Sequence, residues 1–135
     1  MIAELLSVGT ELLLGNIVNT NAAFLSEECA KLGLSVYYQT VVGDNPQRLR
    51  EAIDIAKNRA DVLILGGGLG PTEDDLTKET TAAAFGRSLY MDEHSKELIA
   101  MYFQKLGRDL SVVTANNWKQ AMMPEGAIVI DNDNG

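Results

Sequence analysis

The feature that most constrains this chain is an apolar run that leads directly into a glycine-rich segment. Residues 61–65 are Asp-Val-Leu-Ile-Leu, and four of the next five residues are glycine. An apolar run of this length is typical of a strand that is covered on both faces, in the middle of a parallel sheet. Glycine allows a backbone approach that a β-carbon would block. The segment therefore predicts a central parallel strand that ends in a loop suited to close contact with a ligand.

The rest of the chain alternates strand and helix patterns, which predicts an α/β fold with a mostly parallel sheet. Asn45 and Pro46 suit the N-cap and the first position of a helix, and Gly33 suits the residue after a helix end. The other predicted strands are residues 2–8, 35–42 and 127–130. The predicted helices are residues 22–32, 75–85, 92–106 and 117–122, and one that begins at Pro46 with Leu49, Ala52, Ile53 and Ala56 on its apolar face.

Length and charge limit the classes of protein that this chain can represent. Its 135 residues are enough for one domain with its own core. No apolar run approaches the roughly 20 residues of a membrane-spanning helix, and the N-terminus lacks the basic flank of a signal peptide, so we expect a cytoplasmic protein. The net charge is −8 and the eleven basic residues are scattered, which argues against a nucleic-acid surface. An anionic small molecule is still compatible with this charge.

The C-terminal end of the sequence, its single cysteine and its single histidine give three further predictions. The sequence stops at Gly135, directly after a predicted strand and without a covering helix, so we expect one domain over residues 1–135 that is shortened at its C-terminal end. The single cysteine, Cys29, shares an apolar helical stripe with its neighbours, which favours a buried structural thiol. The single histidine, His94, belongs to a different predicted helix, so we do not expect a Cys-His catalytic pair.

Three loops follow predicted strands and are candidates for a binding site. Ligands of open parallel sheets bind beyond the carboxyl ends of the strands, and here residues 9–21, 43–45 and 66–75 meet that condition. The third loop is the strongest candidate, because amides at a helix N-terminus favour an anion. It fits neither the dinucleotide-binding fingerprint nor the Walker A pattern. Spacing alone leaves a phosphate loop and a simple glycine-rich turn, with Asp74 or Asp75 as a helix N-cap, equally open.

Acidic residues beside this loop suggest a cation. Glu73, Asp74 and Asp75 would repel a phosphate unless a divalent ion such as Mg²⁺ lay between them. The alternative is a helix cap with a solvated charge cluster. Glu11 and Asp44 follow the first and second strands. Each alone is more often a turn or surface residue, but their shared position beside the glycine loop raises the odds of a functional role.

Several other polar residues could serve the same site. Residues 19–21 are Asn-Thr-Asn; one of them must cap a helix, and the others could contact a sugar hydroxyl or a base. Lys78 could reach a phosphate or be solvated. Residues 118–120 cannot be placed from sequence, and packing is the simpler interpretation of Trp118.

Ordered motifs along essentially the whole chain resemble the CinA-type competence/damage-inducible proteins. Residues 7–15 are Ser-Val-Gly-Thr-Glu-Leu-Leu-Leu-Gly and residues 17–21 are Ile-Val-Asn-Thr-Asn. Residues 39–45 are Gln-Thr-Val-Val-Gly-Asp-Asn. Residues 67–72 and 74–79, Gly-Gly-Leu-Gly-Pro-Thr and Asp-Asp-Leu-Thr-Lys-Glu, match the family signature, which Asn116, Asn117, Lys119, Gln120, Ala121 and residues 124–127 continue.

The resemblance implies a three-layer α/β/α sandwich similar to the MoaB–MogA molybdopterin-binding domains of molybdenum-cofactor biosynthesis. In those relatives a GGTG-type loop and an Asp-x-Thr segment bind the ligand and the metal, and a second acid follows the adjacent strand. The matching residues here are Gly67, Gly68, Gly70, Asp75, Thr77 and, for the second acid, Asp44. Leu69 replaces the usual threonine, which favours the CinA branch. That branch implies hydrolysis of ADP-ribose with a divalent metal, often beside a C-terminal nicotinamide-mononucleotide deamidase domain.

The leading hypothesis is therefore a metal-dependent pyrophosphatase that acts on ADP-ribose or a similar nucleotide diphosphate. Asp44 and Asp75 would be catalytic and, with Asp74, would hold Mg²⁺, Mn²⁺ or Co²⁺. The predicted phosphate and nucleotide contacts are Gly9, Thr10, Glu11, Asn19, Asn21, Gly67, Gly68, Leu69, Gly70, Pro71, Thr72, Thr77 and Lys78. The alternatives are a molybdopterin-binding or adenylylating domain and a non-catalytic binding or assembly module. We expect a homo-oligomer without nucleic-acid or membrane partners.

Overall fold

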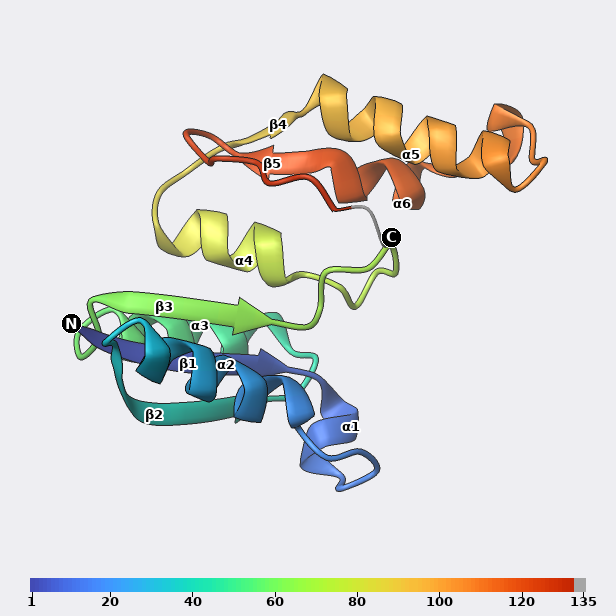
Figure 1. Cartoon of the computed structure of the whole chain (residues 1–135). Helices are drawn as coiled ribbons and strands as arrows, with labels where there is room; N and C mark the ends of the chain where they lie inside the picture. The colour runs from blue at the N-terminus through green and yellow to red at the C-terminus, as the bar shows by residue number, and fades with distance from the viewer. Residues whose placement is uncertain (133–135) are drawn as a thin grey trace.

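Three parallel strands form the main sheet of the protein. The computed structural model describes residues 1–132. The strands are β1 (Ile2–Val8), β2 (Ser35–Val42) and β3 (Val62–Gly66), in the order β2-β1-β3. β1 runs parallel to both neighbours, with Leu6 opposite Thr40 on one side and Leu65 on the other (Figure 1). The predicted α/β class with a mostly parallel sheet is confirmed.

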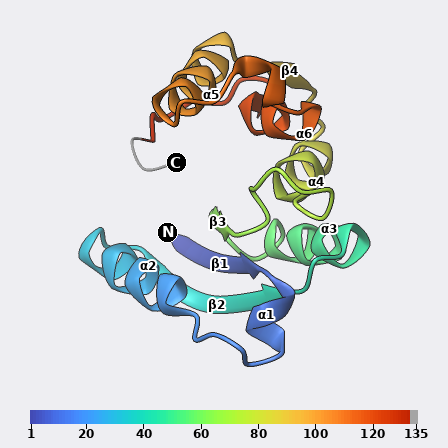
Figure 2. The same ribbon diagram turned by 90° about the vertical axis from the view of Figure 1, so that its right-hand side faces the viewer.

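Helices cover both faces of this sheet. Successive residues of β1 point to opposite faces. On one face Leu6 and Val8 pack with Leu49 and Ile53 of α3 (Pro46–Ala56). On the other face Ala3 and Leu5 pack with Ala22 and Cys29 of α2 (Thr20–Lys31), and Figure 2 shows the two helices on either side of the strands. The predicted three-layer arrangement is confirmed, and so is the buried position of Cys29.

The helices begin and end where local signals predicted. The side chain of Asn19 accepts a hydrogen bond from Ala22 N at the start of α2, and that of Asn45 accepts one from Arg48 N at the start of α3. Pro46 is the first residue of α3. Gly33 follows the end of α2 with a φ of 75°, a conformation that glycine adopts without strain. These signals are local, so a single sequence reveals them.

The middle strand differs from the sequence prediction. β1, not β3, lies at the centre of the sheet that residues 1–132 form, and β3 lies at its edge. The five residues of β3 are all partly exposed. An apolar run indicates that both faces of a strand are covered. It does not indicate which strands lie beside it in the sheet. The short helix α1 (Thr10–Leu13), inside the predicted loop 9–21, was also not foreseen.

The second half of the chain adds a small antiparallel sheet and more helices. After α4 (Thr77–Ala84), β4 (Leu89–Met91) pairs with β5 (Met122–Pro124), and between them lie α5 (Glu93–Lys105), η1 (Leu110–Val112), α6 (Ala115–Trp118) and η2 (Lys119–Ala121). The predicted strand at residues 127–130 is wrong: this segment is irregular, and Ile128 and Ile130 are 92% and 86% exposed. The predicted helix at 117–122 corresponds to α6 and η2, which end before β5.

A buried ion pair ties β1 to the segment before β3. The Glu4 side chain is fully buried, and both of its oxygens accept hydrogen bonds from Arg59, at 2.7 and 2.8 Å. Thr40 Oγ1 donates a third bond at 2.7 Å, and the guanidinium lies 3.9 Å from the Tyr38 ring centroid. The hydrogen bonds from Arg59 lower the pKa of Glu4 despite its burial. The carboxylate is therefore charged and satisfied inside the domain.

Two further predictions concern side chains and membrane contact. His94 on α5 lies 3.1 Å from the Asp131 carboxylate, and this contact raises the pKa of His94. It does not meet Cys29, which lies on the buried face of α2 against β1. Within residues 1–132, no helix combines the length and the apolar character that crossing a membrane would require. The cytoplasmic location stays a prediction. The expected shortening of the domain at its C-terminal end also stays a prediction, and residues 133–135 lie outside the described part of the chain.

Candidate functional site

The glycine loop after β3 packs directly over the end of β1. Gly67 has a φ of 91°, and a β-carbon there would overlap the carbonyl oxygen of Val8, the last residue of β1. Gly68 has a φ of 61°, and a β-carbon there would overlap the Thr77 hydroxyl. Both positions therefore require glycine for two reasons, the backbone conformation and the close approach.

Thr77, the first residue of α4, holds this loop in place. Its side chain is 2% exposed, and its Oγ1 donates a hydrogen bond to Gly67 O at 2.8 Å. Its backbone amide donates to Gly68 O at 3.1 Å. The hydroxyl proton is therefore used within the protein, and the direct contribution of Thr77 is to the shape of the loop.

Asp75 closes a turn between the glycine loop and α4. Its Oδ2 accepts hydrogen bonds from Thr72 N at 2.9 Å and from Thr72 Oγ1 at 2.6 Å. The Thr72 hydroxyl, more than any other group, lowers the pKa of Asp75, and the amides of Thr72 and Gly70 and the charge of Lys119 act in the same direction. Gly70 leaves room for this carboxylate, because a β-carbon there would lie 2.7 Å from Oδ2. Asp75 is therefore ionised and held by the turn.

The alternative in which Asp74 or Asp75 caps the helix is wrong. The N-cap of α4 is Leu76, and no side chain accepts a hydrogen bond from the first turn. The first amides of a helix have no partner within it, and together with the helix dipole they favour an anion. Glu73 and Asp74 are exposed residues of the preceding turn. The start of α4 thus has no side-chain cap, although its first amide, Thr77 N, is already used by Gly68 O.

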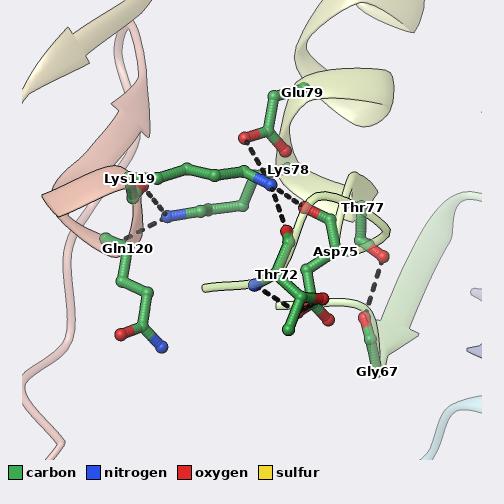
Figure 3. Close-up of polar contacts among 8 residues, drawn as sticks. All are labelled: Gly67, Thr72, Asp75, Thr77, Lys78, Glu79, Lys119 and Gln120. Atoms are coloured by element: carbon green, nitrogen blue, oxygen red, sulfur yellow. Dashed lines mark hydrogen bonds and ion pairs between the residues drawn. The ribbon is translucent and has the colours of Figure 1, made fainter. Parts of the chain in front are cut away.

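Two lysines connect this turn to the later part of the chain (Figure 3). Lys78 Nζ donates hydrogen bonds to Lys119 O at 3.3 Å and Gln120 O at 2.7 Å. Lys119 Nζ in turn donates to the carbonyl oxygens of Thr72 and Asp75. Burial lowers the pKa of Lys78. Lys78, a predicted phosphate contact, thus binds the backbone of η2. The place of Lys119 beside this turn could not be predicted from the sequence.

The loops after β1 and β2 are joined by reciprocal hydrogen bonds. Thr10 N donates to Asp44 Oδ2 at 3.0 Å, and Asp44 N donates to Thr10 Oγ1 at 3.0 Å. Gly9 N donates to Val42 O at 2.9 Å. Asp44 therefore lies beside the end of β1, as its position after an adjacent parallel strand predicted, and one of its oxygens holds the backbone of α1.

A pocket of about 150 Å³ lies between the end of β1, α1, the start of α2 and the first residues of the glycine loop. The Glu11 carboxylate folds back over Gly9 at one wall. Asn19 Nδ2 donates to Ser7 Oγ at 2.9 Å at another. The polar lining residues are Ser7, Glu11, Asn19, Thr20, Asn21, Gly66 and Gly67, and the apolar ones include Leu12, Ile17, Val18, Leu25 and Ile64. The structure thus brings the predicted residues Glu11, Asn19, Asn21 and Gly67 into one pocket.

The three predicted metal ligands are not gathered into one centre. Asp44 is tied to Thr10, Asp75 is tied to Thr72, and Asp74 is exposed. Across the described part of the chain, no group of three or more acidic, histidine or cysteine side chains has the arrangement of a metal site. Magnesium is commonly held by one or two carboxylates together with substrate phosphates. The separate positions of Asp44 and Asp75 are compatible only with that second pattern.

Comparisons with known proteins agree with this architecture. Residues 4–132 match the protein family described as "Probable molybdopterin binding domain". The crystal structure of the protein CinA, of unknown function, from Thermoplasma acidophilum covers 99% of this chain and 76% of that chain, with a TM-score of 0.84 and 35% identity. The molybdopterin biosynthesis enzyme MoaB from Thermus thermophilus shares the fold at 23% identity, with a TM-score of 0.58 over 61% of this chain and 53% of that chain.

The fold and the loop cluster define an α/β domain of the molybdopterin-binding type. A "Putative competence-damage inducible protein" of Bacillus cereus is 57% identical over 135 residues, which are 100% of this chain and 32% of that protein. The chain therefore belongs to the molybdopterin-binding domain family and, within it, to the CinA-type competence/damage-inducible proteins. The family resemblance drawn from the sequence motifs is confirmed.

Proposed function

We propose that this chain binds a nucleotide diphosphate across the ends of β1 and β3 and hydrolyses its phosphoanhydride bond with a divalent cation, with ADP-ribose as the candidate substrate. One observation carries the proposal: Gly67 belongs both to the loop that leads to the uncapped start of α4 and to the lining of the pocket between β1, α1 and the start of α2. The proposed anion site and the proposed nucleoside pocket would therefore be continuous.

The diphosphate is proposed to lie against the glycine loop and the first turn of α4. Backbone amides and the helix dipole attract negative charge there, and the positive φ values of Gly67 and Gly68 set the course of the loop that carries these amides. The nucleoside would occupy the pocket, where apolar side chains such as Ile17 and Ile64 can face a ring and Glu11 and Asn19 can bind hydroxyl groups.

Asp75 is the proposed ligand for the cation, because its carboxylate is ionised and lies between the glycine loop and α4. A bound Mg²⁺ or Mn²⁺ would neutralise phosphate charge and supply an activated water. Asp44, from the loop beside Thr10, would orient that water or provide a second carboxylate. Among residues 1–132 the one histidine is paired with Asp131, so a carboxylate is the natural base.

The test is hydrolysis of ADP-ribose by the purified protein with Mg²⁺, Mn²⁺ or Co²⁺, followed by the same assay on Asp75→Asn. The variant should lose turnover while keeping its fold. Asp109→Asn is the matched control, because Asp109 also accepts a hydrogen bond from a nearby backbone amide, Ser111 N at 2.8 Å, but belongs to the η1 segment. No hydrolysis by the wild-type protein with any of the three metals, or wild-type rates in Asp75→Asn, would exclude the proposal.

A second candidate is molybdopterin binding without pyrophosphatase activity. The family description and the fold shared with MoaB favour it. The same loop would then hold the phosphate of a pterin. Calorimetry with molybdopterin and with ADP-ribose separates the two proposals, since the pyrophosphatase should prefer ADP-ribose.

The remaining proposals concern partners. We propose a small anionic ligand, no nucleic-acid or membrane partner, and a homo-oligomeric state. Light scattering after gel filtration measures the oligomeric state, and a monomer at all concentrations would exclude that part of the proposal.

A further inference from the structure

A reciprocal pair of lysine contacts links η2 to the turn that presents Asp75. Lys78, from α4, holds the backbone of η2 through the carbonyl oxygens of Lys119 and Gln120. Lys119, from η2, holds the backbone of the turn through the carbonyl oxygens of Thr72 and Asp75. Figure 3 shows the two side chains crossing between the segments. Lys78 therefore holds the segment that carries Lys119, and Lys119 holds the turn just before the helix that carries Lys78.

The acceptors of Lys119 are the two ends of the turn that holds the Asp75 carboxylate. The turn is already closed by Asp75 N, which donates to Thr72 O at 3.2 Å. Lys119 adds a charged donor to that same carbonyl at 3.0 Å and a second bond to Asp75 O. Hydrogen bonds from a charged donor are stronger than those between neutral groups. The Lys119 ammonium thereby fixes the backbone on both sides of the Thr72–Asp75 side-chain contact.

Lys119 is largely buried and lies beside the carboxylate of Glu79. Its side chain is 21% exposed, and Glu79 Oε1 lies 3.7 Å from Nζ. Glu79 Oε2 is buried without a hydrogen-bond partner among residues 1–132. The long side chain is therefore largely withdrawn from solvent, and an anionic group balances it from the α4 side.

We propose that Lys119 is a positioning residue of the site: it holds the turn from Thr72 to Asp75 so that the Asp75 carboxylate meets the cation and the diphosphate in one orientation. This inference rests on the proposed function of the same site. A purely architectural role is already served by other contacts, because Lys78 holds η2 and β4 pairs with β5. Loss of the Lys119 ammonium should therefore disturb the site more than the fold.

The experiment compares Lys119→Met, Lys119→Arg and Lys57→Met in the whole chain. Lys57→Met is the matched control, because Lys57 Nζ also donates to a backbone carbonyl, Ala84 O at 2.5 Å, and lies 4.7 Å from the Phe85 ring centroid, at the opposite end of α4. Binding of Mn²⁺ is measured by electron paramagnetic resonance in the presence of α,β-methylene-ADP, a diphosphate that cannot be hydrolysed between its phosphorus atoms. The Mn²⁺ dependence of ADP-ribose hydrolysis is measured beside it.

Lys119→Met should weaken Mn²⁺ binding by about tenfold or more, the range found when a group that orients a metal ligand is removed. The Mn²⁺ concentration for half-maximal hydrolysis should rise in parallel, while KM for ADP-ribose at saturating Mn²⁺ should change much less. Lys119→Arg should restore most of the affinity, since a guanidinium can donate to the same two carbonyls. Lys57→Met should bind Mn²⁺ as the wild type does, even if its thermal stability falls.

The outcomes separate this inference from the proposed function. A wild-type protein that binds Mn²⁺ and the diphosphate but does not hydrolyse ADP-ribose would remove the pyrophosphatase proposal, and the binding data would still decide the role of Lys119. Unchanged Mn²⁺ affinity in Lys119→Met, equal losses in Lys119→Met and Lys57→Met, or no recovery in Lys119→Arg would overturn the positioning role. A wild-type protein that binds no Mn²⁺ with the diphosphate would overturn both.

Discussion

Replacing Thr77 with valine should both destabilise the protein and damage the glycine loop. Valine keeps the shape of the side chain but removes the hydroxyl that donates to Gly67 O at 2.8 Å. Thr77 is 2% exposed, but its acceptor Gly67 is an exposed residue, so water can partly replace the lost donor. Loss of such a partly buried hydrogen bond costs about 1 kcal/mol. For a chain of 135 residues, that loss corresponds to a Tm that is lower by roughly 2–5 °C.

The chain supplies a matched control for this substitution on the same helix. Thr81 Oγ1 is also buried, but within the described residues it has no hydrogen-bond partner. Thr81→Val removes a hydroxyl that satisfies nothing, so it should leave stability unchanged or raise it slightly. Denaturant unfolding of both variants gives the comparison, with equal m values as the check that only stability has changed.

The two variants should also differ in ligand binding. Thr77→Val frees Gly67 O and should weaken binding of α,β-methylene-ADP, whereas Thr81→Val should not. If Thr77→Val were no less stable than Thr81→Val, or bound the diphosphate as tightly as the wild type, the argument that Thr77 fixes the loop would be wrong.

Three further sets of substitutions test other parts of the account. Gly67→Ala should lower the free energy of unfolding by about 2 kcal/mol or more, because φ is positive and the Val8 carbonyl occupies the space of the new β-carbon. Gly86→Ala, at a φ of 64° in open space, should lower it by only about 1 kcal/mol. Thermal melts compare the two variants. The folded-state pKa of Glu4 is lowered, so its ion pair stabilises fully above the ordinary Glu pKa of about 4.3 and loses this effect as pH falls through the folded pKa. Acid titrations of stability should therefore be less steep for Glu4→Gln than for the wild type, and equal slopes would contradict the assignment. Asn19→Ala and Asn45→Ala should each cost about 1 kcal/mol as lost helix caps, but only Asn19→Ala should weaken nucleotide binding, which calorimetry measures.

Local signals explain which elements could be predicted from sequence. Helix α3 was predicted correctly because Asn45, Pro46 and the apolar spacing of its residues all lie within the element. Residues 127–130 carry an equally clear apolar pattern, yet they form no strand, because a strand needs a partner and nothing in its own sequence supplies one. The central place of β1 was missed for the same reason: neighbours in a sheet are a property of the whole topology.

The candidate site was predictable only in part. Parallel topology brings the loops after adjacent strands to one edge of the sheet, so the neighbourhood of Gly67, Glu11 and Asn19 followed from the sequence. The use of Asp75 as the acceptor of a turn, not of a helix cap, depends on Thr72 and Gly70 together and was not foreseen. The role of Lys119 could not be predicted from its local sequence, because its contact with Thr72 spans 47 residues.

The most direct test of the central idea is the response of backbone amides to a diphosphate. In ¹H–¹⁵N spectra of the protein titrated with α,β-methylene-ADP and Mg²⁺, we predict the largest shifts at the amides of residues 67–70 and 77–79, followed by those of Glu11 and Asn19. Absence of saturable shifts at residues 67–70, with the strongest changes elsewhere in the chain, would contradict the claim that this loop holds the anion.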